Sequence, residues 1–253
     1  MRFCEFCGTI YQEVLNQNWY KPIIDAGLRL DIIDYGASLD KYRVIFTPLM
    51  PAFEHDIAER MEKWLNNGGT WIVGPLTDIR NEIGARWSDK GYGSLEKLAG
   101  VKLKFHAPDT NSRLTAEWND GTEFKGNIWY ELLEDCPGAL AKVTEGYSSV
   151  IGCPVLTHRQ IGKGQIILLG TIPSYNDMKK IIDMFCPAKQ DSSGEVIVCP
   201  RYGKNHDGVI IVEYGGKHAS YECVDQFRDI LSDKIYRGKI DINPYDVLVL
   251  ERQ

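Results

Sequence analysis

The feature that most constrains the fold is a series of short apolar runs separated by helical segments. The runs at Leu28–Asp34, Tyr42–Thr47 and Thr70–Gly74 lack the strict polar–apolar alternation of a strand with one solvated face. An amphipathic helix is expected between the last two, over Glu54–Leu65, and it ends at Asn66–Gly69. Strands of this kind are covered on both faces, which predicts an α/β, doubly wound, flavodoxin-like domain with parallel strands.

The same reasoning extends to about residue 187. The run Gln165–Leu169 predicts another buried strand, and two alternating segments before it predict an antiparallel pair. The pair covers Ala139–Thr144 and Pro154–His158, the further helices cover Asn16–Ala26, Ser94–Leu98 and Asn176–Phe185, and a further strand covers Val101–His106.

A polar linker, Pro187–Gly194, predicts a boundary between domain 1–187 and domain 188–253. Beyond it, short apolar segments alternate with turns such as Gly215–Gly216 and Asn243–Pro244. This spacing predicts a small antiparallel β-sandwich domain. The expected strands are Glu195–Cys199, Val209–Tyr214, Ala219–Val224 and Val247–Leu250.

Charge and hydropathy exclude two classes of partner. The 253 residues include 35 acidic and 29 basic side chains, a net charge of −6, with both signs interspersed. No basic stripe is available to neutralise a phosphate backbone, so no nucleic acid is expected as a partner. No apolar run approaches the roughly 20 residues that a membrane span requires, so no membrane is expected either.

The seven cysteines favour a reducing compartment. An odd number in mostly apolar, strand-like contexts indicates buried, reduced thiols, which predicts a cytoplasmic location. The spacing of Cys4 and Cys7 suits half of a zinc site or a redox pair, but the sequence supplies no second pair at ligand spacing. The favoured interpretation is two small apolar residues near a strand end, and no metal or cofactor is expected.

Several ordered motifs resemble one known family. They are Tyr20–Gly27 with Leu30–Ile33, Leu39–Pro48, Trp64–Val73, Gly152–Pro154 with Gly162–Gly164 and Gly170–Thr171, and then Cys199–Arg201 and Ile242–Val247. Together they resemble the trimerisation domain and the small C-terminal β domain of family 42 glycoside hydrolases, which are β-galactosidases. The trimerisation domain in that family has a class I glutamine-amidotransferase-like fold. The resemblance covers nearly the whole chain.

The resemblance implies a part of an enzyme without its catalytic centre. The family's (β/α)8 barrel, with its acid/base and nucleophile glutamates, would need about 250 residues of its own. The first strand of the α/β domain is represented only by Met1–Phe6. We therefore expect a non-catalytic oligomerisation and accessory region, self-associating as a trimer, with a catalytic barrel domain or subunit as a partner. The alternative is a stand-alone carbohydrate-binding or amidotransferase-like protein without glycosidase activity.

The densest group of acids is the best candidate for independent glycosidase chemistry. Glu131, Glu134 and Asp135 follow the aromatic pair Trp129–Tyr130, so the segment could serve as a sugar platform. The favoured interpretation is an amphipathic turn whose acids face water. No catalytic residue is therefore assigned.

The amidotransferase-like alternative needs a nucleophile on a sharp strand-to-helix turn. The turn expected after Gly74 holds Pro75, Leu76 and Thr77, with neither Cys nor Ser. The turn after Gly170 offers Ile172, Pro173 and Ser174, where a His would be needed. The triad is therefore predicted to be lost.

The remaining candidates have structural interpretations. His106 and His158 lie in strand-like segments, where a lone His is more often a hydrogen-bonded structural residue. Gly162–Gly164 precedes a strand and lacks the spacing of a phosphate loop, so it predicts a tight turn. Five aromatic residues are candidates for exposed contacts with another subunit or a barrel, with core packing as the alternative: Trp87, Tyr92, Trp118, Trp129 and Tyr130.

Overall fold

The computed structural model describes most of the chain. The described ranges are 12–28, 30–53, 56–109, 113–186, 192–204 and 206–253. The predicted strand at Met1–Phe6, the pair Cys4 and Cys7, and residues 187–191 of the predicted linker lie outside these ranges.

The chain divides into two compact units. The larger comprises Met1–Trp19 and Ile33–Ile181, and the smaller comprises Tyr20–Ile32 and Ile182–Gln253. Residues near the N-terminus therefore contribute to the unit that holds most of the C-terminal strands. The domain boundary between residues 187 and 188 stays a prediction.

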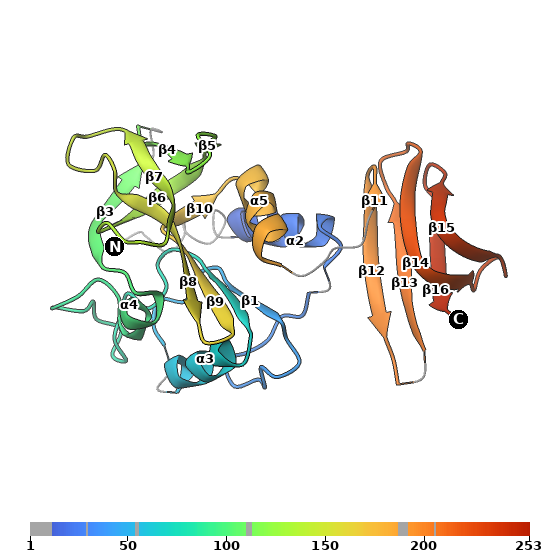
Figure 1. Ribbon diagram of the computed structural model, residues 1–253, viewed down its shortest axis with the longest axis horizontal. Helices are drawn as coiled ribbons and strands as arrows, with labels where there is room; N and C mark the ends of the chain where they lie inside the picture. Colours follow the sequence, from blue (N-terminus) through green and yellow to red (C-terminus); the bar gives the residue numbers. More distant parts are fainter. Residues whose placement is uncertain (1–11, 29, 54–55, 110–112, 187–191, 205) are drawn as a thin grey trace. The chain divides into compact units, whose positions relative to one another are not determined.

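The larger unit is built around a mixed sheet (Figure 1). Within the described residues its strand order is β1–β2–β9–β8–β7–β4–β5. The bounds are β1 Val44–Thr47, β2 Thr70–Val73, β9 Gly164–Leu169, β8 Pro154–Ile161, β7 Ala139–Glu145, β4 Thr115–Trp118 and β5 Glu123–Phe124. Strands β1, β2 and β9 are parallel, whereas the pairings from β9 to β5 are antiparallel.

The doubly wound parallel arrangement is therefore found for three strands, and the unit is richer in sheet than the sequence suggested. The reason lies in the β8–β9 connection, where Gly162 has φ 56° in a two-residue turn, too short for the crossover that parallel strands require. The flavodoxin-like description is not confirmed.

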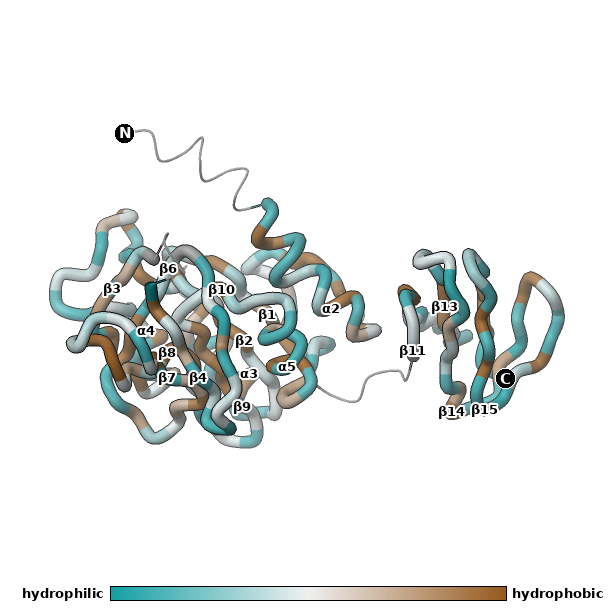
Figure 2. Tube along the Cα trace, turned by 90° about the horizontal axis from the view of Figure 1, so that it is seen from above, coloured by the Kyte–Doolittle hydropathy of each residue, from teal (hydrophilic) through white to brown (hydrophobic). Residues whose placement is uncertain are grey.

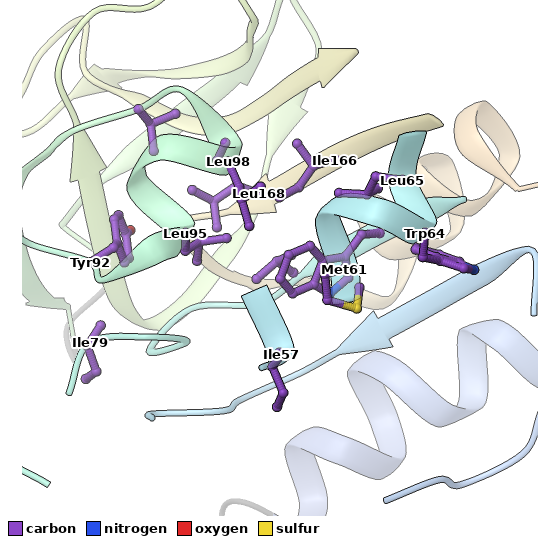
Figure 3. Close-up of a cluster of buried hydrophobic side chains, with 14 of the residues drawn as sticks. Ile57, Met61, Trp64, Leu65, Ile79, Tyr92, Leu95, Leu98, Ile166 and Leu168 are labelled. Atoms are coloured by element: carbon purple, nitrogen blue, oxygen red, sulfur yellow. The ribbon is translucent and has the colours of Figure 1, made fainter. Parts of the chain in front are cut away.

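The core of the larger unit lies between two helices and the parallel strands (Figure 3). Helix α3, Ile57–Asn66, directs its apolar stripe at β2 and β9, and helix α4, Ser94–Ala99, adds Leu95 and Leu98 to the same cluster. The turn from α3 into β2 needs Gly69, because a Cβ there would come within 2.4 Å of the Trp64 ring. This packing fixes the carboxyl end of β2 and the loop that follows it.

One predicted strand is absent from the described residues. The N-terminal helical segment consists of a π-helix, η1, over Leu15–Tyr20 and helix α2 over Lys21–Asp25, and it turns at Gly27 with φ 70°. Residues 28 and 30–34 then form no strand, and Ile32 is 93% exposed. Because β1 is the edge of the described sheet, this apolar run has no strand partner there.

A second sheet of the larger unit carries the candidate site. Its order among the described strands is β10–β6–β3, all antiparallel. The bounds are β10 Thr171–Pro173, β6 Gly126–Leu133 and β3 Leu103–Asp109. Strand β6 was not predicted, because its sequence suggested an amphipathic turn instead.

The smaller unit contains an antiparallel sheet, as the turn spacing predicted, but its described strands are hydrogen-bonded into one sheet instead of the two sheets expected for a sandwich. The strand order is β11–β14–β16–β13–β12, and β15 pairs with β14. The bounds are β11 Ser192–Ser193, β12 Val196–Tyr202, β13 Asp207–Glu213, β14 Ala219–Asp229, β15 Ile235–Ile242 and β16 Val247–Arg252. Figure 2 shows hydrophilic and hydrophobic residues interspersed along these strands, and one face buries a core that includes Ile211 and Leu250.

Candidate functional site around Glu131

A fully buried carboxylate lies at the centre of the larger unit. Glu131 of β6 is 0% exposed, so the prediction that this acid faces water is wrong. Its Oε2 accepts a hydrogen bond from the Tyr92 hydroxyl at 2.9 Å, and its Oε1 accepts the backbone N–H of Leu76 at 3.1 Å. Strand β6 is the central strand of this sheet, between β3 and β10, and it directs the Glu131 side chain into the fold. Glu131 is therefore held inside the fold by one side-chain donor and one backbone donor.

Burial controls the ionisation of Glu131. Desolvation raises its pKa from 4.5 to about 7, although the hydrogen bonds from Tyr92 and Leu76 and the charge of Arg86 act in the opposite direction. Burial, followed by the charge of Glu131 and the hydrogen bond to it, raises the pKa of Tyr92 well above its usual value. Near neutral pH, the protonated and the ionised forms of Glu131 are therefore both populated in the folded protein.

His106 of β3 lies beside this carboxylate. Its Nδ1 is 3.7 Å from Glu131 Oε1, and its Nε2 contacts the Arg86 guanidinium. Burial, followed by the charge of Arg86, lowers the pKa of His106 to about 4. A neutral imidazole in a fixed contact agrees with the structural role predicted for this residue.

The loop after β2 contains two residues with positive φ and no nucleophilic side chain at either position. Leu76 and Asp78 adopt φ 60° and φ 56°, a backbone conformation that is unusual for residues other than glycine. The N–H of Leu76 is directed at Glu131, and Asp78 Oδ2 accepts the N–H of Leu95 at 2.8 Å at the start of α4. Neither Cys nor Ser stands at these positions, as the sequence indicated.

The other members of the acidic group do not join Glu131. Glu134 and Asp135 are exposed, and Asp135 forms an ion pair with Lys142 at 2.8 Å. Tyr130 is 2% exposed and cannot act as a sugar platform. A retaining glycosidase needs two carboxylates about 5 Å apart across an accessible sugar site. This group does not provide that arrangement.

Most of the aromatic residues considered as contacts are core residues. Tyr92, Trp118 and Tyr130 are at most 5% exposed, so the expectation that they form an exposed surface is wrong. Their polar groups can be buried because they have hydrogen-bond partners inside the fold, as the Tyr92 hydroxyl has in Glu131. Trp87 and Trp129 are half-buried.

His158 and the glycine turn take the structural roles that were predicted. His158 Nε2 is 3.0 Å from Gln165 Oε1, and Gln165 donates to the Thr70 hydroxyl, so the three side chains bridge β8, β9 and β2. Gly162–Gly164 forms the β8–β9 turn. A Cβ at Gly164 would come within 2.2 Å of two backbone oxygens of the α3–β2 connection, so only glycine fits there.

The described residues form one further depression, whose lining gives no indication of a ligand. An open depression of about 590 Å³ is lined by residues that include Lys97, Lys102, Glu134 and Asp135, and its charges of both signs define no ligand class. In the described part of the chain no group of three or more His, Cys, Asp or Glu side chains could hold a metal ion. No helix among the described residues is both long and apolar enough to cross a membrane.

Three of the described cysteines, Cys136, Cys186 and Cys223, are predicted to react slowly with alkylating agents. Burial raises the pKa of Cys186 to about 12 and that of Cys223 to about 11, and it also raises the pKa of Cys136. Thiolate is the reactive form, so iodoacetamide at neutral pH is expected to label these three residues far more slowly in the folded chain than in urea. Peptide mass spectrometry measures both rates. Rapid labelling of one of them in the folded chain would identify an activated thiol and support the amidotransferase-like alternative.

Together, the fold and this site define a sheet-rich α/β unit with a buried acid, joined in sequence to an antiparallel β unit. A sequence model of the β-galactosidase trimerisation domain matches residues 7–189. The chain belongs to this family.

Individual relatives agree with this assignment. The chain is 28% identical over 245 residues to the β-galactosidase YesZ of Bacillus subtilis, an alignment that covers 92% of this chain and 36% of the relative. It also matches the structure of a β-galactosidase from Bacillus circulans sp. alkalophilus, with a TM-score of 0.87 and 20% identity over 96% of this chain and 38% of that one. An α-L-fucosidase from Paenibacillus thiaminolyticus shares the fold at a TM-score of 0.60 and 10% identity, over 92% of this chain and 44% of that one.

The chain spans little more than a third of the length of these β-galactosidases. The β-galactosidase activity in the names of these relatives is stated for the full-length enzymes. Among the described residues there is no (β/α)8 barrel.

Proposed function

We propose that this chain is the oligomerisation and accessory region of a β-galactosidase-like glycoside hydrolase, that it self-associates as a trimer, and that a catalytic barrel domain or subunit is its partner. The observation that supports this most directly is the match to the β-galactosidase trimerisation domain over residues 7–189. The hydrolysis of β-galactosides belongs to the parent enzyme in this proposal.

The site geometry supports a non-catalytic role. Each carboxylate oxygen of Glu131 accepts a hydrogen bond within the fold, and the neighbouring acids Glu134 and Asp135 are on the surface. The region therefore contributes surfaces and rigidity to the assembly. The cytoplasmic location and the division into domains 1–187 and 188–253 remain predictions from the sequence.

We also propose that the larger unit is a class I glutamine-amidotransferase-like domain without a triad. What supports this is the turn directly after β2, where Leu76 adopts φ 60° in a position suited to a nucleophile. A leucine side chain cannot act as a nucleophile, so the turn carries no catalytic group at this position.

Light scattering across a range of concentrations tests the self-association. We expect a mass near three times the 28.7 kDa of one chain, because a cyclic trimer closes its interfaces and stops growing. The mass should stay constant above the dissociation range. A chain that remains at 28.7 kDa at every concentration would contradict self-association by this region alone.

A further inference from the structure

Three neighbouring strands of the smaller unit, β12, β13 and β16, are apolar on both sides of the sheet (Figure 1). Their residues alternate between the buried core, which includes Ile211 and Leu250, and the opposite side. Six half-buried or exposed residues on that opposite side are also apolar, and together they are called the apolar face below. They are Ile197, Cys199, Ile210, Val212, Val247 and Val249.

The strand register aligns the apolar face into two rows. The first row runs from Ile197 through Val212 to Val247, one residue on each strand. The second row holds the other three members in the same order of strands. Side chains directly opposite each other on antiparallel strands have Cβ atoms about 5 Å apart. The six side chains therefore form one continuous surface.

The turn after β14 extends the second row. The Ile230 N–H donates to the Val249 oxygen at 2.8 Å, one position beyond the pair of Asp229 with Leu250. Asp229 and Leu250 are buried on the core side, so the alternation places Ile230 on the opposite side, where it is 52% exposed. Asp229 Oδ1 accepts the N–H groups of Leu231 at 3.3 Å and Val249 at 3.1 Å, which fixes the turn.

The adjoining part of the same sheet is polar on this side. Ser220 and Glu222 of β14 lie opposite Asp241 and Lys239 of β15. This is the pattern of an antiparallel sheet with one solvated face, and the apolar face departs from it. A continuous apolar patch on a protein surface indicates a surface that another protein covers.

Charged residues border the apolar face. Arg201 and Glu251 belong to the row beyond Val249, and Glu251 pairs with Arg228 at 3.2 Å and with His206 at 2.8 Å. An apolar centre with a charged border is typical of a protein–protein interface. Within the unit, helix α2 contacts β12 at one side of the face, whereas β16 at the other side carries the exposed Val247.

We propose that the apolar face and Ile230 dock against an apolar surface of the catalytic domain or subunit, an inference that rests on the proposed function. Two observations favour this occupant over another copy of the chain. The match to the trimerisation domain ends at residue 189, before the first strand of the face. The alignments with relatives cover more than nine-tenths of this chain but little more than a third of each enzyme, so in those enzymes the smaller unit accompanies a large further body of protein.

Binding to the unaligned part of a relative tests the docking. The probes are the part of YesZ from Bacillus subtilis outside the alignment and the equivalent part of the Bacillus circulans enzyme, each titrated with the full chain by calorimetry. Val247→Lys and Ile230→Lys change residues that are 45% and 52% exposed. Each is expected to weaken binding at least tenfold, because docking would bury the new charge.

Val224→Lys is the matched control for both variants. Val224 is 91% exposed and lies on β14, which is not a strand of the apolar face, so this variant should bind as the parent chain does. Equal binding by all four chains would overturn the docking and leave the proposed function intact. If the parent chain bound neither probe, the catalytic partner in the proposed function would be contradicted, and the docking with it.

Two measurements on the chain alone would reveal a different occupant. Urea midpoints of Val247→Lys and Ile230→Lys should equal that of Val224→Lys; clearly lower midpoints would mean that the chain itself covers the face. Light scattering should give the parent mass for all three variants. A smaller mass for Val247→Lys alone or with Ile230→Lys would assign the face to another copy of the chain. Either result would overturn the proposal.

Discussion

Replacing Glu131 with glutamine is expected to remove a large part of the pH dependence of global stability. The pKa of Glu131 is raised from 4.5 to about 7 in the folded chain. The folded state therefore binds the proton more tightly than the unfolded state. The resulting stabilisation is complete below about pH 4.5 and is lost as the pH rises through about 7.

The size of the effect follows from the displacement of the pKa. Between about pH 5 and about pH 8, the parent chain should lose roughly 2–3 kcal/mol of unfolding free energy through this one carboxyl group. Glutamine has no proton to release, so the difference in stability between the variant and the parent should shift by that amount in favour of the variant at the higher pH. Urea unfolding at both pH values gives the two free energies.

Glu134→Gln is the matched control for this measurement. Glu134 is exposed and lies only three residues further along the chain. Its removal should change stability equally at the two pH values. If Glu131→Gln also changes stability equally at both, Glu131 is ionised to the same extent in the folded and unfolded chains, and the account of its burial is wrong.

The parts of the fold that the sequence predicted are those in which local pattern and tertiary environment agree. Helix α3 was predicted because its apolar stripe and its glycine-rich end are both local signals. The strands β2 and β9 were predicted because continuous apolar runs need cover on both faces, which the core around α3 and α4 provides. The β8–β9 turn was predicted from its glycines.

The parts that were missed depend on partners distant in the sequence. Strand β6 contains Glu131 and reads as amphipathic, but its acid is inside because Tyr92 and the Leu76 N–H satisfy it there. The sequence gives no direct sign of those partners. One indirect signal existed, since an acid flanked by Tyr130 and Leu132 in an alternating segment fits a strand as well as a turn.

The N-terminal run at Leu28–Asp34 shows the opposite error. Its Leu and Ile residues are as apolar as those of β2, but the described residues of this run find no neighbouring strand, and Ile32 is exposed. An apolar run predicts a strand only where the topology supplies a partner for its backbone groups. Pairing is a property of the whole sheet.

Replacing Asp177 is expected to be costly, because its side chain joins several elements of the larger unit. It lies near the start of α5, Tyr175–Phe185, and is 6% exposed. Its Oδ1 accepts the Trp118 indole N–H at 2.8 Å, and its Oδ2 accepts the Lys125 N–H at 3.0 Å and the Ser174 hydroxyl at 2.5 Å. One side chain thus joins α5, β4 and the segment that leads into β6.

Asp177→Ala is expected to destabilise the chain by roughly 3 kcal/mol, because it leaves buried donors without an acceptor and removes the carboxylate from the first turn of α5. Asp177→Asn keeps one carbonyl oxygen and should cost less. Asp120→Ala is the control, since Asp120 is also an acid near Trp118 but lies on the surface in an ion pair with Lys180. Urea midpoints should rank the chains as parent, Asp120→Ala, Asp177→Asn and Asp177→Ala, from most to least stable. Equal midpoints for the two alanine variants would mean that the Trp118 and Lys125 donors find other acceptors, and that the larger unit does not depend on this connection.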